Sequence, residues 1–306
     1  MGRRAALVLS EELYRAVVET CPDGIVVADL DGTIIAANTA AAQLHGFERG
    51  DELVGANLFQ AVSLDDRDQM EKTIGDVLKL GQVRHVEHRL LRCDGTFPAD
   101  VNISAVRDEN GMPLVVVAVV RDMTEQRRLE EDLRHQALHD SLTGLANRVL
   151  LYDRLEHALG VASRAGVPVA LLLLDLDGFK VVNDRFGHDF GDALLEEVAG
   201  RLRSVARESD TVARLGGDEF AIVVPEDVNG ALQVAGRVRE ALVPLVTINQ
   251  TVVSIGVSIG IARFPEDGQD RATLFRLADT AMYAAKRDRT GCTVYSPDLG
   301  SMLGRF

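Results

Sequence analysis

Residues from about 11 to 123 alternate hydrophobic and polar side chains in short runs that end at turn residues. Such alternation predicts half-buried β-strands, and the pairs Asp31-Gly32 and Asp94-Gly95 predict tight turns between them. The strand candidates are 24–30, 33–38, 83–93, 96–106 and 112–122. Two segments, Ala40–His45 and Asp65–Leu80, have helical spacing instead. The order of two strands, helices and three strands predicts an antiparallel sheet with helices on one face.

From Ser141 onward the pattern changes to longer helices between strongly apolar strands. Pro168–Leu174 is a continuous apolar run, as expected of a central strand that is buried on both faces. Thr211–Leu215 and Phe220–Val224 flank two glycines and predict a hairpin. The remaining predicted elements are the helices Leu151–Ala165, Asp192–Ala206, Ala231–Leu242 and Arg271–Lys286 and the strand Val252–Ala262. The whole pattern predicts an α+β chain.

A polar segment, Arg121–His139, separates the two halves and contains neither glycine nor proline. It is predicted to be helical. Leu129 and Leu133 are spaced as neighbouring seam positions of a coiled coil, but two residues do not make the three or four repeats that such a seam needs. A solvated linker helix and a dimeric coiled coil both fit this segment.

Length and charge narrow the class of protein. The 306 residues fit two domains, and 46% hydrophobic with 26% charged residues is typical of globular proteins. A net charge of −14 would repel a phosphate backbone, so nucleic acid is not expected as a partner. The three cysteines are not spaced as a zinc site or a disulfide framework, and no apolar run is long enough for a membrane span. We therefore expect a cytoplasmic protein with no membrane partner.

Two acidic clusters stand at predicted strand ends. Asp175 and Asp177 follow the buried strand, and period-two geometry puts both on one face if the strand continues through them. Asp218 and Glu219 follow Gly216-Gly217 at the hairpin tip. Carboxylates suit Mg²⁺, and glycines let backbone N–H groups approach phosphate oxygens. Each cluster alone is also what a solvated strand end or a two-residue turn looks like. Together, in one domain, they favour metal-assisted chemistry on a phosphate.

Three long motifs make the resemblance specific. DSLTGLANR at 140–148, DLDGFKVVNDRFGHDFGD at 175–192 and RLGGDEF at 214–220 resemble the GGDEF family of diguanylate cyclases, in order and in spacing. The resemblance covers 138 to about 295. It implies a fold similar to nucleotidyl cyclases and the polymerase palm, with a mainly antiparallel sheet and flanking helices. It also implies a homodimer in which each subunit binds one GTP, and each 3′-hydroxyl attacks the α-phosphate of the other GTP to give cyclic di-GMP.

The resemblance implies roles for individual residues. The metal ligands for Mg²⁺, or for Mn²⁺ in its place, would be Asp175, the carbonyl of Leu176, Asp218 and Glu219. Asp218 and Glu219 would be catalytic, with Asp218 accepting the proton of the 3′-hydroxyl. The substrate-binding residues would be Gly216 and Gly217 for phosphate, Asn183 and Asp192 for guanine, and Lys180 and Lys286 for phosphate. Arg207 and Asp210 form an R-x-x-D that matches the family's product-inhibition site for cyclic di-GMP.

The chain departs from the family near its C-terminus. Where the family usually reads A-K-x-x-G-R-N, this sequence has Ala285 to Gly291, with Thr290 at the usual phosphate-binding arginine. Arg289 and Arg287 are the candidates to replace it.

The first half resembles a PAS sensor domain. The residues that carry this resemblance are CPDGIVVADLDGTIIAAN at 21–38, RCDGTFPADV at 92–101 and VRDMTEQRRLEEDL at 120–133. The predicted organisation is a PAS-like domain at 11–123, a signalling helix at 124–139 and a GGDEF domain at 140–298. The sequence does not identify the PAS ligand, and His85 and His88, on opposite faces of one strand, are interpreted as surface residues.

Two further functions remain open at this stage. One is a catalytically silent GGDEF domain that serves as a receptor for GTP or cyclic di-GMP; the acids Asp175, Asp218 and Glu219 argue against it because silent members usually lose some of them. The other is a cyclase with relaxed base choice, against which Asp192 argues, since a carboxylate suits the N–H donors of guanine.

Overall fold

The computed structural model describes residues 12–248 and 250–299. The chain divides into two compact units, Met1–Glu131 and Asp132–Phe306. Among the described residues, no helix has both the length and the apolar character needed to cross a membrane.

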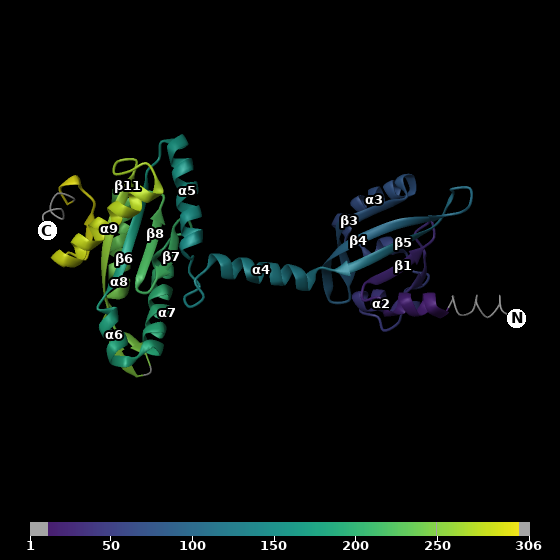
Figure 1. The fold of residues 1–306 in the computed structure, drawn as a ribbon, viewed down its shortest axis with the longest axis horizontal. Helices are drawn as coiled ribbons and strands as arrows, with labels where there is room; N and C mark the ends of the chain where they lie inside the picture. The colour runs from purple at the N-terminus through teal and green to yellow at the C-terminus, as the bar shows by residue number, and fades with distance from the viewer. Residues whose placement is uncertain (1–11, 249, 300–306) are drawn as a thin grey trace. The chain divides into compact units, whose positions relative to one another are not determined.

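The first unit is built on one antiparallel sheet with the strand order β2-β1-β5-β4-β3 (Figure 1). Its strands are β1 Gly24–Ala28, β2 Ile34–Ala37, β3 Gln82–Arg92, β4 Gly95–Arg107 and β5 Pro113–Asp122. Its helices are α2 Thr39–His45 and α3 Arg67–Leu80, with the short 3₁₀ helices η1 Gly50–Leu53, η2 Leu58–Ala61 and η3 Leu64–Asp66 between them; residues 12–20 are also helical. The predicted order of two strands, helices and three strands is confirmed.

One face of this sheet is buried beneath the helices. Alternate residues of β4, such as Val101 and Ile103, pack with Met70 and Val77 of α3 in one apolar cluster. The interpretation of His88 as a surface residue is wrong, because only 2% of it is exposed. The register is regular from Val86 onward, so His88 faces the covered side of the sheet together with Leu90, two residues further along.

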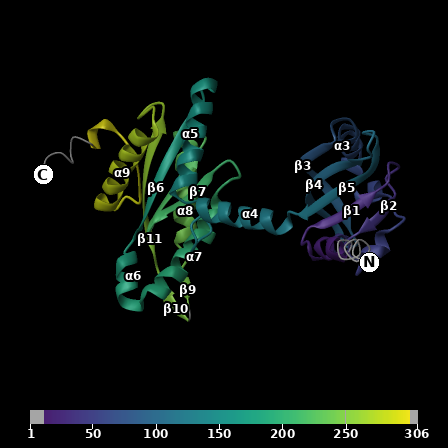
Figure 2. The ribbon, with the colours of Figure 1, turned by 45° about the vertical axis from the view of Figure 1, so that its right-hand side comes forward.

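The second unit has a five-stranded sheet in the order β12-β11-β6-β8-β7, antiparallel except where β12 joins β11 (Figures 1 and 2). Its strands are β6 Val169–Asp177, β7 Thr211–Gly216, β8 Glu219–Val224, β11 Gly256–Phe264 and β12 Cys292–Val294, beside a separate pair, β9 Val246–Ile248 and β10 Thr251–Val253. Its helices are α5 Arg148–Ala165, α6 Phe179–Phe186, α7 His188–Val205, α8 Val228–Leu242 and α9 Arg271–Asp288.

The central strand β6 has apolar layers on both sides. Leu172 and Leu174 pack in the cluster that contains α7 and α8, whereas Leu171 and Leu173 pack in the cluster that contains α5 and α9. This double burial explains the continuous apolar run, and the mainly antiparallel sheet with flanking helices is confirmed.

Two features of the predicted elements need correction. The predicted strand Val252–Ala262 is two strands, because β10 pairs with β9 and only β11 joins the main sheet. The predicted helix Arg121–His139 begins at Thr124, as α4 Thr124–Leu138, because β5 continues to Asp122. The pattern also missed α6, β9 and β12.

Candidate active site

The acidic residues converge at one end of the central strands. Asp175 of β6 lies directly opposite Glu219 of β8 in the register. The strand continues through Asp177, so Asp175 and Asp177 share a face, as the spacing predicted. The N–H of Leu176 donates to the carbonyl of Asp218 over 3.2 Å. The four residues predicted to bind metal therefore lie together at this edge of the sheet.

The charges at this edge are not balanced by the chain itself. Lys286 of α9 donates to Oδ1 of Asp175 over 2.5 Å, and this hydrogen bond raises the pKa of Lys286. Loss of hydration, followed by the negative charges of Asp175 and Asp218, raises the pKa of Glu219. The acids at this edge outnumber the Lys286 ammonium that reaches Asp175, and a bound cation would neutralise the excess of negative charge.

The hairpin that carries Asp218 is held by an arginine that the sequence analysis did not select. Gly216 and Gly217 have φ values of 138° and 55°, which other residues rarely adopt. Nε and Nη2 of Arg214 both donate to the carbonyl of Gly217 over 3.0 Å, and Nη1 donates to Oδ1 of Asp140 over 3.0 Å. Burial raises the pKa of Asp140, but hydrogen bonds from Thr143 and the charge of Arg214 outweigh it and leave that pKa lowered.

The residues predicted to bind guanine lie where α6 meets α7. Oδ1 of Asn183 is buried and has no hydrogen-bond partner among the described residues. It lies so close to Gly191 that a Cβ there would be 1.8 Å away, and Asp192 is the next residue and is exposed. The exposed carboxylate of Asp192 can accept from N–H donors on a purine edge, whereas Oδ1 of Asn183 is closed off from solvent in this structure. Lys180, on the same helix as Asn183, is exposed.

The C-terminal end of α9 contributes cations beside the acids. Lys286 and Arg289 line a hollow together with Asp177, Ser258 and Arg239. Arg289 has a φ of 53° and ends α9 in the left-handed conformation. Arg287 is ion-paired with its neighbour Asp288 instead. Of the two arginines that could replace the residue missing at Thr290, Arg289 is thus the one in the hollow with Lys286.

The residues at this edge fit a hard divalent cation. No group of three or more histidine, cysteine, aspartate or glutamate side chains is already arranged as a metal site among the described residues. However, Asp175 and Glu219 are paired in register and Asp218 is adjacent, and loss of hydration, followed by the charges of Asp175 and Asp218, raises the pKa of Glu219. Oxygen ligands of this kind, with open positions for substrate phosphates, are what Mg²⁺ takes.

The R-x-x-D lies away from the acids, in a loop between α7 and β7. The backbone N–H of Arg207 donates to the carboxylate of Asp210, and the N–H of Asp210 donates to the carbonyl of Arg207. Both residues line a large hollow of about 770 Å³. The guanidinium of Arg207 is ion-paired with Glu226, a partner that the sequence did not indicate.

Comparison with known families identifies both units. The model of the diguanylate cyclase GGDEF domain matches residues 137–292, and that of a PAS domain matches residues 22–125. The chain therefore belongs to the GGDEF family of diguanylate cyclases and carries a PAS domain before its GGDEF domain.

Individual relatives agree with this assignment. Diguanylate cyclase TpbB of Pseudomonas aeruginosa is 44% identical over 172 residues, which cover 54% of this chain and 40% of the relative. The solved GGDEF domain of TpbB covers 55% of this chain and 99% of that domain, with 39% identity and a TM-score of 0.53. The coiled coil and GGDEF domain of DgcB from Caulobacter crescentus, solved in complex with c-di-GMP, matches with 31% identity and a TM-score of 0.52, covering 56% of this chain and 92% of that one. The chain spans 24% to 40% of the length of the curated relatives that it matches first.

Proposed function

We propose that the protein is an active diguanylate cyclase that condenses two GTP into cyclic di-GMP and two pyrophosphates. The observation that carries this proposal is the register of the two central strands, which puts Asp175 opposite Glu219 beside the Gly-Gly turn and Asp218. A silent receptor has no need of three carboxylates at one strand edge, where their mutual repulsion opposes folding.

The roles follow the positions of the side chains. Asp175, the carbonyl of Leu176, Asp218 and Glu219 would hold Mg²⁺, which supplies charge neutralisation at the phosphates when it is bound. Gly216 and Gly217 would hold phosphate through their N–H groups: a Cβ at either position would meet no atom within 4 Å, so the outer side of the turn is open. Lys180 and Lys286 would bind phosphate oxygens, with Arg289 taking the part of the arginine that is missing at Thr290.

The chemistry is a phosphoryl transfer. The 3′-oxygen of one GTP forms a bond with the α-phosphorus of the other, and the bond from that phosphorus to the pyrophosphate oxygen breaks. The same transfer in the opposite direction closes the ring and releases the second pyrophosphate. Asp218 would accept the proton of the 3′-hydroxyl. Asn183 and Asp192 would select guanine through its N1–H and amino donors. Because each chain offers one such edge, the reaction needs two chains facing each other, and we infer a homodimer.

Regulation is proposed at two places. Cyclic di-GMP would bind Arg207 and Asp210 and inhibit the enzyme. The PAS domain, residues 11–123, would act through the helix at 124–139 on the domain at 140–298, by changing how two helices of a dimer are paired.

The test is direct. Purified protein is incubated with GTP and Mg²⁺, with Mn²⁺ in a parallel sample, and cyclic di-GMP is measured by mass spectrometry. Product from the wild type and none from Asp218→Ala or Glu219→Ala is expected. The opposite result is a wild type that binds GTP or cyclic di-GMP but makes no product, even when its GGDEF domain is fused to a dimeric coiled coil. That result would contradict the proposed cyclase activity and support a catalytically silent receptor.

A further inference from the structure

Two histidines at the end of α4 lie against each other. His135 is in the last turn of the helix, and His139 follows the helix directly. Their rings are parallel within 5°, with centroids 4.2 Å apart. The backbone N–H of His139 donates to the carbonyl of His135 over 2.9 Å, so the helical spacing continues to His139 and keeps both side chains on one face.

The spacing of the two rings fits a metal ion. Two histidines four positions apart on a helix are a recurring pair of zinc ligands, because both rings project from the same face. Tetrahedral Zn²⁺ binds imidazole nitrogens at about 2.0–2.1 Å, which puts two such nitrogens about 3.3–3.4 Å apart. The ring centroids are 4.2 Å apart, so a small tilt of the rings brings a nitrogen of each to one ion.

The ring of His139 is held as that of a metal ligand usually is. Its Nδ1 lies 3.3 Å from the carbonyl of Gly144. A carbonyl only accepts, so this hydrogen bond puts the proton on Nδ1 and leaves the lone pair of Nε2 free in the neutral ring. Metal-binding histidines usually donate their other ring N–H to a carbonyl or a carboxylate in this way.

The pair is accessible to an ion from solvent. His135 is exposed, and its ring nitrogens make no hydrogen bond among the described residues. His139 borders the hollow that contains Arg207 and Asp210. In the described part of the chain, no third histidine, cysteine or acid completes a cluster with the pair, so water would fill the other positions of an ion. Imidazole ligands favour zinc and its neighbours over Mg²⁺, which prefers oxygen.

We propose that His135 and His139 bind a divalent transition-metal ion of the zinc type, with water in its remaining positions. The ion joins the last turn of α4 to the segment that leads into the second unit. His139 forms a β-bridge with Ala146, and the carbonyl of Ala146 accepts from the N–H of Arg214 over 2.9 Å. The bound ion therefore stiffens the connection between α4 and β7, the strand that ends at Gly216. This binding does not depend on the cyclase activity proposed above.

The experiment measures the dissociation constant of Zn²⁺ from the full chain by isothermal titration calorimetry. An excess of Mg²⁺ is present to occupy sites made of oxygen ligands. His135→Gln and His139→Gln each remove one of the two ligands. Two ligands on one scaffold bind about 10²–10⁴-fold more tightly than one, so either substitution should weaken binding at least about a hundredfold. The control His157→Gln removes an exposed histidine of α5 that has no second histidine one turn away, and should leave the affinity unchanged.

Two measurements keep the test decisive. Thermal melting without metal establishes that each variant is folded. If a variant does not fold, nitrogen-15 resonances of the wild type replace it: Zn²⁺ should shift Nε2 of His139 and one ring nitrogen of His135, and Mg²⁺ should shift neither. The proposal is overturned if Zn²⁺ shifts neither ring, if a folded His135→Gln or His139→Gln binds Zn²⁺ as tightly as the wild type, or if His157→Gln weakens binding as much as they do. Loss of the Zn²⁺ site in Asp175→Asn would also overturn it, because the ion would then lie at the acidic edge.

Discussion

Replacing Arg214 is the sharpest test of how the Gly216-Gly217 turn is held. Its side chain is only 11% exposed and joins the carbonyl of Gly217 to the carboxylate of Asp140. Arg214→Ala leaves both acceptors without their donor. Arg214→Lys keeps the charge, but a lysine ammonium lacks the planar fork that reaches both acceptors at once.

The magnitude follows from these contacts. A hydrogen bond to a charged group contributes about 1.5–3 kcal/mol, and removing one partner of a fully buried ion pair costs about 3–5 kcal/mol. Asp140 retains 20% exposure and its bonds to Thr143, which reduces the second figure. We therefore expect Arg214→Ala to lower the free energy of unfolding of the second unit by about 2–4 kcal/mol, and Arg214→Lys by about half as much.

Calorimetry of the full chain measures this effect as a shift of the melting transition of the second unit. About 3 kcal/mol corresponds to about 6–12 °C for a domain of this size. Because the turn carries Asp218, kcat for cyclic di-GMP should fall more than KM for GTP rises. Asp140→Asn adds a pH test. The pKa of Asp140 is lowered by folding, so its stabilising contribution is complete at neutral pH and is lost as the pH falls below about 4.

Two results would refute this reasoning. One is a melting temperature and kcat of Arg214→Ala equal to those of the wild type. The other is an Asp140→Asn variant whose second unit loses stability between pH 5 and pH 3 as steeply as the wild type does, because the titrating group would then lie elsewhere.

Three other substitutions, two of them with a matched control, test the remaining contacts. Gly191→Ala places a Cβ 1.8 Å from Oδ1 of Asn183 and should raise KM for GTP about tenfold. The control Gly200→Ala, on the same helix, meets no atom within 4 Å and should only stabilise the helix, by about 0.5–1 kcal/mol. Steady-state kinetics measures the first effect and thermal melting the second. Arg289→Gly should raise KM for GTP about tenfold, with little backbone strain because glycine tolerates the positive φ of this position. Arg287→Ala removes an arginine that is already paired with Asp288 and should change KM less than about twofold. Equal effects of the two substitutions would reject Arg289 as the phosphate ligand. Glu226→Gln frees the arginine of the R-x-x-D, so half-inhibition should need up to about fivefold less cyclic di-GMP, and an unchanged inhibition curve would contradict competition by this carboxylate.

The sequence predicted those parts of the site that depend on neighbours along the chain. The apolar run that ends at Asp175 defines a strand buried on both faces, and period-two geometry then aligns Asp175 with Asp177. Gly216-Gly217 predicts the turn by its freedom at positive φ. The order of strands and helices followed from the same local patterns.

The rest depends on contacts between residues far apart in sequence. The pairing of Arg214 with Asp140 spans 74 positions, and the residues next to each of them in the sequence do not predict it. The break within Val252–Ala262 was missed because β10 and β11 both bury apolar residues, and the pattern does not say with which strand each pairs. His88 was misplaced because its polar ring suggested exposure, although regular alternation with Leu90 puts it on the covered face.

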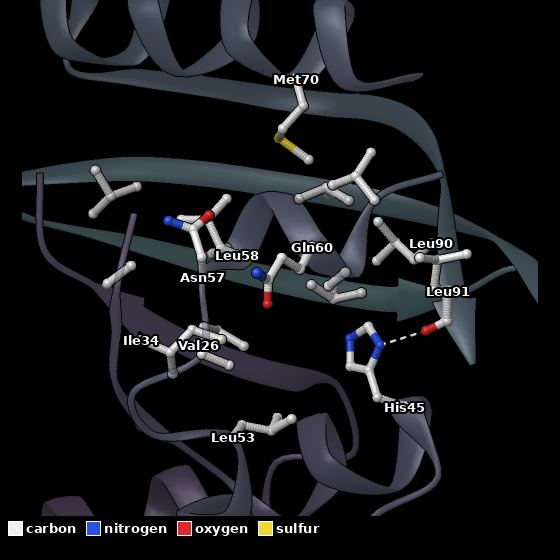
Figure 3. A pocket seen from close by; sticks show the side chains of 18 of the residues that line it. Val26, Ile34, His45, Leu53, Asn57, Leu58, Gln60, Met70, Leu90 and Leu91 are labelled. Atoms are coloured by element: carbon white, nitrogen blue, oxygen red, sulfur yellow. Dashed lines mark hydrogen bonds between the residues drawn. The ribbon is translucent and has the colours of Figure 1, made fainter. Parts of the chain in front are cut away.

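An arginine–aspartate pair lies near each end of the helix α4. At its start, Asp122 accepts from the N–H of Thr124 over 2.7 Å and is bound by Arg92, which lines the cavity of the PAS domain (Figure 3). Beyond its end, Asp140 is bound by Arg214, which holds the Gly216-Gly217 turn. A molecule that displaces Arg92 would remove the partner of the carboxylate that caps the first turn of α4. A rotation of the last turn of α4 would in turn act on Asp140. We therefore expect Arg92→Gln to change how the cyclase activity responds to a PAS ligand, while leaving the turn at Asp218 intact. Arg214→Lys should instead slow cyclic di-GMP synthesis both with and without that ligand.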